Sequence, residues 1–186
     1  MIAGMFMKTS NPRDEREGRI RLNKVSLRDE SEFLSAARTS RELHKDWVDV
    51  PRTARTFRRY AIEMRTRDDI AFLVRRTDTG GLVGVIELQD IFMGNFCNAY
   101  VIYYAFSGQE RQGLMTVAMK EVIRIAFGRL KLHRLEANIQ PENHASRCLA
   151  SSCGFRKEGF SPKFLKKGGE WRDHERWALL STDNLK

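Results

Sequence analysis

A turn that carries Gly108 and Gly113 joins an apolar segment to a long amphipathic stretch, and it is the part of the sequence best suited to binding chemistry. Glycine permits backbone conformations that a Cβ hinders, and the first N–H groups of a helix have no partner inside the helix. A helix N-terminus also carries about half a positive charge. The turn therefore favours a bound phosphate, although ordinary strand-to-helix turns share the pattern.

The side chains with catalytic potential are scattered along the chain. Glu87 lies inside an otherwise apolar segment, where it is either a general base, with Asp90 behind it, or a surface carboxylate at a sheet edge. His174 could titrate near neutral pH, but its adjacency to Asp173 is more typical of polar contacts in a hairpin. The sequence has no C-x-x-C pair and no metal-binding histidine spacing, so we expect neither a metal site nor disulfides. A reducing cytoplasm is the expected compartment.

The composition indicates a single globular domain. The chain has 186 residues, of which 41% are hydrophobic and 31% charged, and no apolar run approaches the ~20 residues of a membrane span. We interpret residues 1–18 as a flexible leader and 19–186 as one domain. The net charge of +9 fits an anionic partner or a solvated surface equally well. Six arginines gather on one predicted helix, namely Arg52, Arg55, Arg58, Arg59, Arg65 and Arg67.

The spacing of apolar residues predicts the helices and strands that position these side chains. Met115, Met119, Val122 and Ala126 recur at helical intervals and predict a long helix that ends near Leu130. Other predicted helices cover 31–40, 43–50, 53–67 and 143–152, and strands cover 20–25, 70–76, 82–91, 99–106, 133–139, 155–165 and 171–180. Because a helix connects strands 99–106 and 133–139, these two should be parallel within a mixed α/β sheet.

Three segments in this order resemble the GNAT superfamily of acyl-CoA-dependent N-acyltransferases. They are ERQGLMTVAM at 110–119, NIQPENHASRCLASSCGFRKEG at 138–159 and GGEWRDHERWAL at 168–179. The likeness covers roughly 19–181 and is greatest to the RimJ/RimL-type ribosomal-protein-alanine N-acetyltransferases. It implies a mostly antiparallel central sheet, flanked by helices, with splayed parallel strands in the middle.

The resemblance implies acetyl-CoA as the acyl donor, with no metal. Backbone N–H groups of the turn would hold its pyrophosphate, and Asn143 and the splayed strands would contact the pantetheine arm. The cofactor-binding residues implied are Tyr104, Arg111, Gln112, Gly113, Leu114, Met115, Thr116, Asn138 and Asn143. The superfamily loop usually reads Gln/Arg-x-x-Gly-x-Gly/Ala, whereas this chain has Glu110 first and Met115 last. We expect the Glu110 carboxylate to turn away from the phosphates or to pair with an arginine.

The catalytic residues follow the resemblance only in part. Ala150 occupies the position where many members have a tyrosine, so Ser146 is the expected proton relay to sulfur. Leu165 occupies the position of a glutamate in the RimL-like pattern, which leaves Glu87 as the candidate base. An α-amine with a pKa near ~7.8 is deprotonated at pH 7 for about 1 kcal/mol, whereas a lysine near ~10.4 requires about 4.6 kcal/mol. An α-amine is thus the easier acceptor.

The sequence therefore predicts an acetyltransferase that acts on a primary amine, specifically a protein or peptide N-terminal α-amine, by direct attack in a ternary complex. The arginine-rich helix over 53–67 would line the acceptor side. Two alternatives stay open: a weakly catalytic binding module that associates with RNA or ribosomes through a basic face, and an enzyme for a small-molecule amine. We expect no membrane association and a monomer or homodimer.

Overall fold

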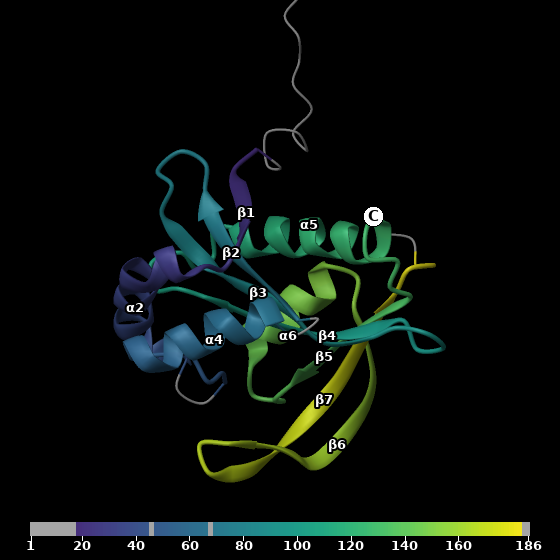
Figure 1. Ribbon diagram of the computed structural model, residues 1–186. Coiled ribbons are helices and arrows are strands. Elements are labelled where there is room, and N and C mark those ends of the chain that lie inside the picture. The colour runs from purple at the N-terminus through teal and green to yellow at the C-terminus, as the bar shows by residue number, and fades with distance from the viewer. Residues whose placement is uncertain (1–17, 45–46, 67–68, 184–186) are drawn as a thin grey trace, which may run out of the picture.

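The computed structural model describes residues 18–44, 47–66 and 69–183, and these build a seven-stranded sheet in the order β1-β2-β3-β4-β5-β7-β6 (Figure 1). All neighbouring strands are antiparallel except β4 and β5. The strands are β1 Ile20–Lys24, β2 Ile70–Arg76, β3 Leu82–Phe92, β4 Asn98–Ala105, β5 Arg134–Ile139, β6 Arg156–Lys167 and β7 Glu170–Leu180. The helices are η1 Leu27–Asp29, α2 Glu30–Thr39, α3 Arg41–His44, α4 Ala54–Thr66, α5 Leu114–Gly128 and α6 His144–Ser152.

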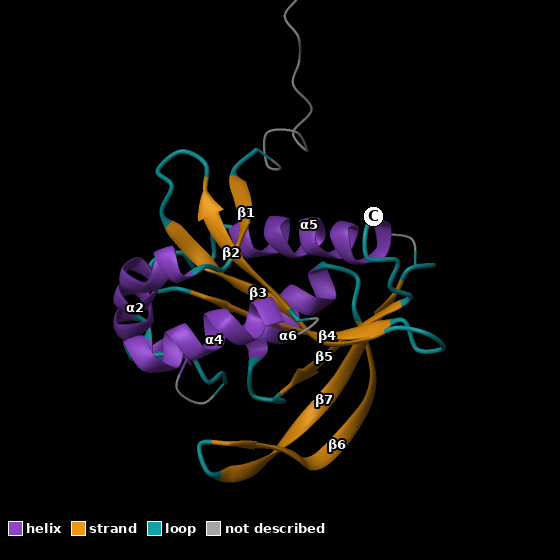
Figure 2. Ribbon diagram, viewed as in Figure 1, coloured by secondary structure: helices purple, strands orange, loops and turns teal. Residues whose placement is uncertain are grey.

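Helices cover both faces of the sheet, as Figure 2 shows. Phe72 and Val74 of β2 pack in one apolar cluster with α5 and α6, whereas Ala71 and Leu73 pack in a second cluster with α2 and α4. This alternation follows from the two-residue period of a strand, and it explains why β2 is an almost continuous apolar run. The two clusters define an α5 face and an α4 face.

The structure confirms the predicted mixed sheet and most predicted elements, with one clear error. The stretch 43–50 was predicted to be helical, but α3 ends at His44, and residues 47–50 form a turn and irregular chain. Val48 and Val50 are β-branched and Pro51 disfavours helical geometry in the residue before it, which explains the difference. The predicted leader, apart from Gly18, lies outside the described residues. So do Arg67 and the side chain of Arg65.

The parallel pair β4–β5 separates along its length. Only Asn98, Ala99 and Tyr100 of β4 pair with β5, opposite 134–136. Beyond this point β4 continues to Ala105 beside β3, and β5 continues to Ile139 beside β7. The backbone groups that these two half-strands turn toward each other have no strand partner. The predicted splay is therefore present, and we refer to it as the β4–β5 gap.

The last hairpin extends past the rest of the sheet. β7 pairs with β5 only over 175–180, whereas its pairing with β6 continues to the turn at Lys167 and Glu170. The free part is a two-stranded ribbon, which projects from the body of the molecule in Figure 1. Three large apolar side chains are exposed on it, namely Phe164, Leu165 and Trp171. We call residues 161–174 the ribbon.

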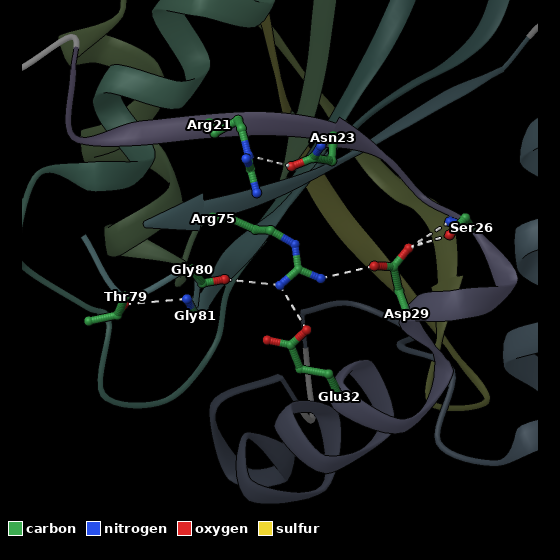
Figure 3. Close-up of polar contacts among 9 residues, drawn as sticks. All are labelled: Arg21, Asn23, Ser26, Asp29, Glu32, Arg75, Thr79, Gly80 and Gly81. Atoms are coloured by element: carbon green, nitrogen blue, oxygen red, sulfur yellow. Dashed lines mark hydrogen bonds and ion pairs between the residues drawn. The ribbon is translucent and has the colours of Figure 1, made fainter. Parts of the chain in front are cut away.

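A polar cluster around Arg75 fastens α2 to the β2–β3 hairpin (Figure 3). The guanidinium donates to Asp29 at 2.9 Å, to Glu32 at 2.7 Å and to the carbonyl oxygen of Gly80 at 3.0 Å. The Arg75 side chain is only 13% exposed. Asp29 is itself fixed, because both the N–H and the hydroxyl of Ser26 donate to its other oxygen.

We expect Arg75→Met to lower the free energy of unfolding by about 2 kcal/mol, because it leaves the partly buried Asp29 carboxylate and the exposed Glu32 carboxylate without their cation. Arg21→Met is the matched control, since Arg21 is exposed and, among the described residues, its side chain donates a hydrogen bond only to that of Asn23. It should change stability by less than about 0.5 kcal/mol. Urea unfolding measures both variants, and equal midpoints for the two would contradict this role of Arg75.

Candidate active site

A cavity of ≈ 1850 Å³ adjoins the β4–β5 gap and receives side chains from both faces of the sheet. From the α5 side it is lined by the start of α5 and by α6, and from the α4 side by α4 and the ribbon. Val101 to Ala105 of β4 and Ala137 to Ile139 of β5 border it along the gap. A molecule in the gap would thus be reached by groups from α4, α5, α6 and the ribbon.

The turn before α5 has the backbone geometry of an anion site. Gly113 is the N-cap residue with φ of 73°, and Arg111 also has a positive φ, of 60°. No side chain caps the helix, and its first turn contains no acidic residue. A Cβ placed on Gly113 would meet no described atom within 4 Å, so the space above the helix start is open. These features leave the first N–H groups of α5 available to a phosphate.

Contacts within the turn and from a neighbouring hairpin hold it in this form. The Glu110 carboxylate accepts the N–H of Gly108 at 2.7 Å, so it turns back onto its own backbone and does not pair with an arginine. The Gln112 amide donates to the Gly108 carbonyl oxygen at 3.0 Å and accepts from Arg76 of β2 at 2.8 Å. Sequence reasoning missed Arg76, because its contact with the turn is not local.

The start of α6 is held against the far side of the gap. Asn143 is its N-cap residue, and its side chain accepts the N–H of Ser146 at 3.1 Å. Tyr103, from the unpaired half of β4, donates its hydroxyl to the Ser146 carbonyl oxygen at 2.8 Å. The Ser146 side chain also interacts with the Tyr103 hydroxyl, and Ser146 lines the cavity, where its hydroxyl can meet a ligand.

Glu87 forms a buried polar network on the α4 face. Its side chain accepts from Tyr60 of α4 at 2.6 Å and from Gln89 at 2.5 Å, and the residue is only 4% exposed. Burial raises the pKa of the carboxyl. The interpretation of Glu87 as a surface carboxylate at a sheet edge is wrong, because β3 lies between β2 and β4. Asp90, by contrast, is exposed in a bulge.

A second buried group on this face is His44. Its Nε2 lies 2.7 Å from the carbonyl oxygen of Ala105, which fixes the tautomer that carries the proton on Nε2, and its Nδ1 has no partner among the described residues. Burial lowers the pKa of the imidazole. The hydroxyl of Tyr104, whose ring packs against His44, is likewise buried without a partner. No sequence signal distinguished His44 from the other histidines.

The remaining predicted cofactor residues could contact a ligand either through their backbone groups or through their side chains. Leu114 and Met115 are buried in the core, so only their backbone N–H groups face a ligand. Thr116 and Asn138 line the cavity. Tyr104 belongs to the α4-face network instead of extending into the gap, so any contact it makes with the pantetheine arm would come from its backbone.

Other residues considered from the sequence take clear positions. Ala150 is fully buried, and Leu165 is exposed on the ribbon. His174 is also buried: its Nδ1 lies 2.9 Å from the Arg172 carbonyl oxygen, and Asp173 instead accepts the N–H of Lys163. Cys148 is exposed in the cavity, whereas burial raises the pKa of the Cys153 thiol to about 11.

Comparison with known proteins decides what this site belongs to. The family model of the acetyltransferase (GNAT) domain matches residues 19–156. The chain belongs to the GNAT acetyltransferase family. It is an N-acetyltransferase that uses acetyl-CoA, and the uncapped start of α5 and the β4–β5 gap suit the pyrophosphate and the pantetheine arm of that cofactor. In the described part of the chain, no cluster of metal-ligating side chains is present, and no helix is long and apolar enough to span a bilayer.

Relatives of this GNAT protein include further acetyltransferases. It is 30% identical to the probable N-acetyltransferase YjcK of Bacillus subtilis over 139 residues, which cover 75% of this chain and 77% of the relative. It is 33% identical to the [ribosomal protein uS5]-alanine N-acetyltransferase of Escherichia coli over 106 residues, 57% of this chain and about half (55%) of that protein. RimJ of Mycobacterium smegmatis in complex with CoA-disulfide shares the fold, with a TM-score of 0.81, 24% identity, and 89% and 83% of the two chains covered.

Proposed function

We propose that this protein acetylates the N-terminal α-amine of a protein or peptide by direct attack of the amine in a ternary complex. The observation that carries the proposal is the β4–β5 gap, with the turn before α5 and α6 on one face and the Glu87 network on the other. Cofactor and acceptor can then approach the gap from opposite faces. The uS5-alanine N-acetyltransferase of E. coli, a relative named for an alanine of a ribosomal protein, supports a protein acceptor.

On the α5 face, the chain's own groups bind and orient. Backbone N–H groups from Arg111 to Thr116 would hold the pyrophosphate, and Asn143 and the unpaired edges of β4 and β5 would hold the arm. Acetyl-CoA, when bound, supplies the thioester whose acetyl group is transferred. Ser146 is suited to deliver a proton at the sulfur, because it lines the cavity from the first turn of α6.

On the α4 face, Glu87 is suited to remove a proton from the acceptor ammonium. Glu87 pairs with Ile102 of β4, so it lies one strand spacing, about 4.8 Å, from the edge of the gap. That separation favours proton transfer through one water. Burial raises the pKa of the carboxyl and makes the carboxylate a stronger base than an exposed one, and an α-amine near ~7.8 holds its proton less tightly than a lysine near ~10.4. An α-amine is therefore the acceptor that this site can activate most readily.

We expect Ser146→Ala to lower kcat by about tenfold to a hundredfold while leaving the KM for acetyl-CoA nearly unchanged, because the hydroxyl is used only when the thiolate departs. The measurement is CoA thiol release with acetyl-CoA and a peptide that has a free N-terminal alanine. Ser151→Ala is the matched control, since Ser151 is exposed on the same helix outside the cavity. Equal kcat values for both variants would remove Ser146 from the mechanism.

The same assay decides between acceptor classes. Turnover of peptides that is lost when their N-terminus is blocked supports the α-amine. Turnover of small amines such as diamines, with none of peptides, would replace the proposal by an enzyme for small molecules.

A further inference from the structure

On the α4 face, the cavity is bordered by two walls from distant parts of the sequence. One wall consists of the segment before α4 and its first turns, with Thr56 and Tyr60. The other is the ribbon, with Phe164 and Leu165. The Lys167 ammonium lies 3.1 Å from an Asp49 carboxylate oxygen and joins the walls. We call the space between them the acceptor groove.

The floor of the acceptor groove suits a cation. It holds the buried Glu87 carboxylate, and the aromatic rings of Tyr60, Tyr104 and Phe164 line the same cavity. A carboxylate attracts an ammonium directly, and aromatic faces attract it through their quadrupole. The Lys167 ammonium already lowers the pKa of Glu87, although burial dominates and raises it, so a positive charge near this carboxylate is favourable.

The upper edge of the acceptor groove has the opposite charge. Arg52 and Arg59 on one wall and Lys166 on the other are exposed and line the cavity. Within the described residues, no carboxylate pairs with Arg52 or Lys166, and Arg59 Nε lies 4.0 Å from a Glu63 carboxylate oxygen. Arg58, in contrast, points away and pairs with Glu30 at 2.6 Å. We call Arg52, Arg59 and Lys166 the basic rim.

We infer that the acceptor groove selects polypeptides whose N-terminal ammonium is followed by acidic side chains. The inference rests on the proposed α-amine acceptor and names its substrate class. The ammonium meets the anionic floor, and the next residues of an extended tail leave the groove between the cations of the basic rim, where carboxylates neutralise them. An RNA strand would match the basic rim but would meet the Glu87 carboxylate on the floor, so the tail fits better.

The test compares three peptides that begin with the same three residues, with a free N-terminal alanine, and continue with four Glu, four Gln or four Lys. At low ionic strength, kcat/KM should fall from the acidic to the basic peptide by roughly tenfold per step, as several weak exposed ion pairs provide together. The difference in kcat/KM between the peptides should shrink as salt is added. In the triple variant Arg52→Gln, Arg59→Gln, Lys166→Gln, the three peptides should become nearly equal.

The matched control is Lys24→Gln, Arg28→Gln, Arg38→Gln, which removes the same charge from exposed positions outside the cavity. It should keep the full preference for the acidic peptide.

Equal turnover of all three peptides by the unmodified protein overturns the inference but leaves the α-amine function standing. Loss of the preference in the control also overturns it, because net charge would then be responsible. Salt-sensitive RNA binding that depends on the basic rim, without any peptide preference, would assign the rim to RNA instead. Turnover of no peptide at all removes the proposed function itself.

Discussion

Glu87→Gln is expected to lower kcat/KM for a peptide α-amine about a hundredfold at pH 7, the contribution typical of a general base. Gln preserves the volume of the side chain and can still accept from Tyr60, so the network should keep its shape. Asp90→Asn is the matched control, because Asp90 was the second candidate base and is exposed in a bulge. It should retain nearly full activity in the same thiol-release assay.

The pH dependence gives this prediction a second readout. Burial raises the pKa of Glu87, so kcat/KM of the unmodified protein should rise with pH through that raised value and should not rise further as the free amine loses its proton near ~7.8, because Glu87 already removes that proton from the bound ammonium. Glu87→Gln lacks this base, so its kcat/KM should rise only as the free amine loses its proton. A variant with unchanged kcat/KM at every pH would show that Glu87 takes no part in proton transfer.

As pH rises, the free energy of unfolding should fall while kcat/KM rises. Because the folded-state pKa of Glu87 is raised, the proton on Glu87 favours the folded state fully at low pH, and this stabilisation is lost as pH rises through the raised pKa. The Gln variant has no such loss, so at neutral pH it should be at least as stable as the parent. A lower melting temperature for the variant would show that the carboxylate has a structural role.

Gly84→Ala should have the largest effect on stability, about 3 kcal/mol or more, which for a domain of this size lowers Tm by roughly 6–12 °C. A Cβ at Gly84 would lie 2.4 Å from the Tyr104 carbonyl oxygen and 2.6 Å from Met115 Sδ. The first is a backbone atom, so no rotamer change relieves the clash, and β3 must move away from β4. Both neighbours border the site, so CoA affinity should fall as well.

Gly81→Ala provides the control for this effect. Its Cβ would meet only Thr79 Oγ1, at the ordinary distance of 3.5 Å, and its φ is not in the left-handed region. The substitution should be nearly neutral or slightly stabilising, because alanine restricts the unfolded chain. Calorimetry distinguishes the two variants. A Gly84→Ala protein that melts within a degree or two of the parent would contradict the close approach of β3 to β4 and α5.

The sequence predicts those parts of the fold that depend on local rules. The β2–β3 hairpin and α5 follow from apolar periodicity and turn residues, and the three GNAT-like segments predict that the turn from Arg111 to Thr116 and Asn143 bind the cofactor. It fails where the deciding contact is distant. Tyr60 lies 27 residues from Glu87, yet its hydroxyl makes that carboxylate part of a buried network. The placement of β7 between β5 and β6 is equally non-local.

Some of the missed information was present in a weaker form. Glu87 and Gln89 are two residues apart in an apolar strand, so they must share a face, and this spacing indicates a polar pair directed at one partner. Nothing comparable marked His44, whose role depends on the Ala105 carbonyl oxygen 61 residues away. In the sequence, Gly84 is indistinguishable from any other glycine in a strand. Only the fold shows that Met115 packs against it.

The short pairing of β4 with β5 leaves the sheet in two halves whose strands pair with each other only at Asn98–Tyr100 of β4. One half carries β1 to β4 with α2 and α4, and the other carries β5, β7 and β6. The two walls of the acceptor groove belong to different halves, and Lys167 and Asp49 connect them. A molecule that fills the gap therefore touches both halves of the sheet, and so does a molecule that fills the groove on the opposite face.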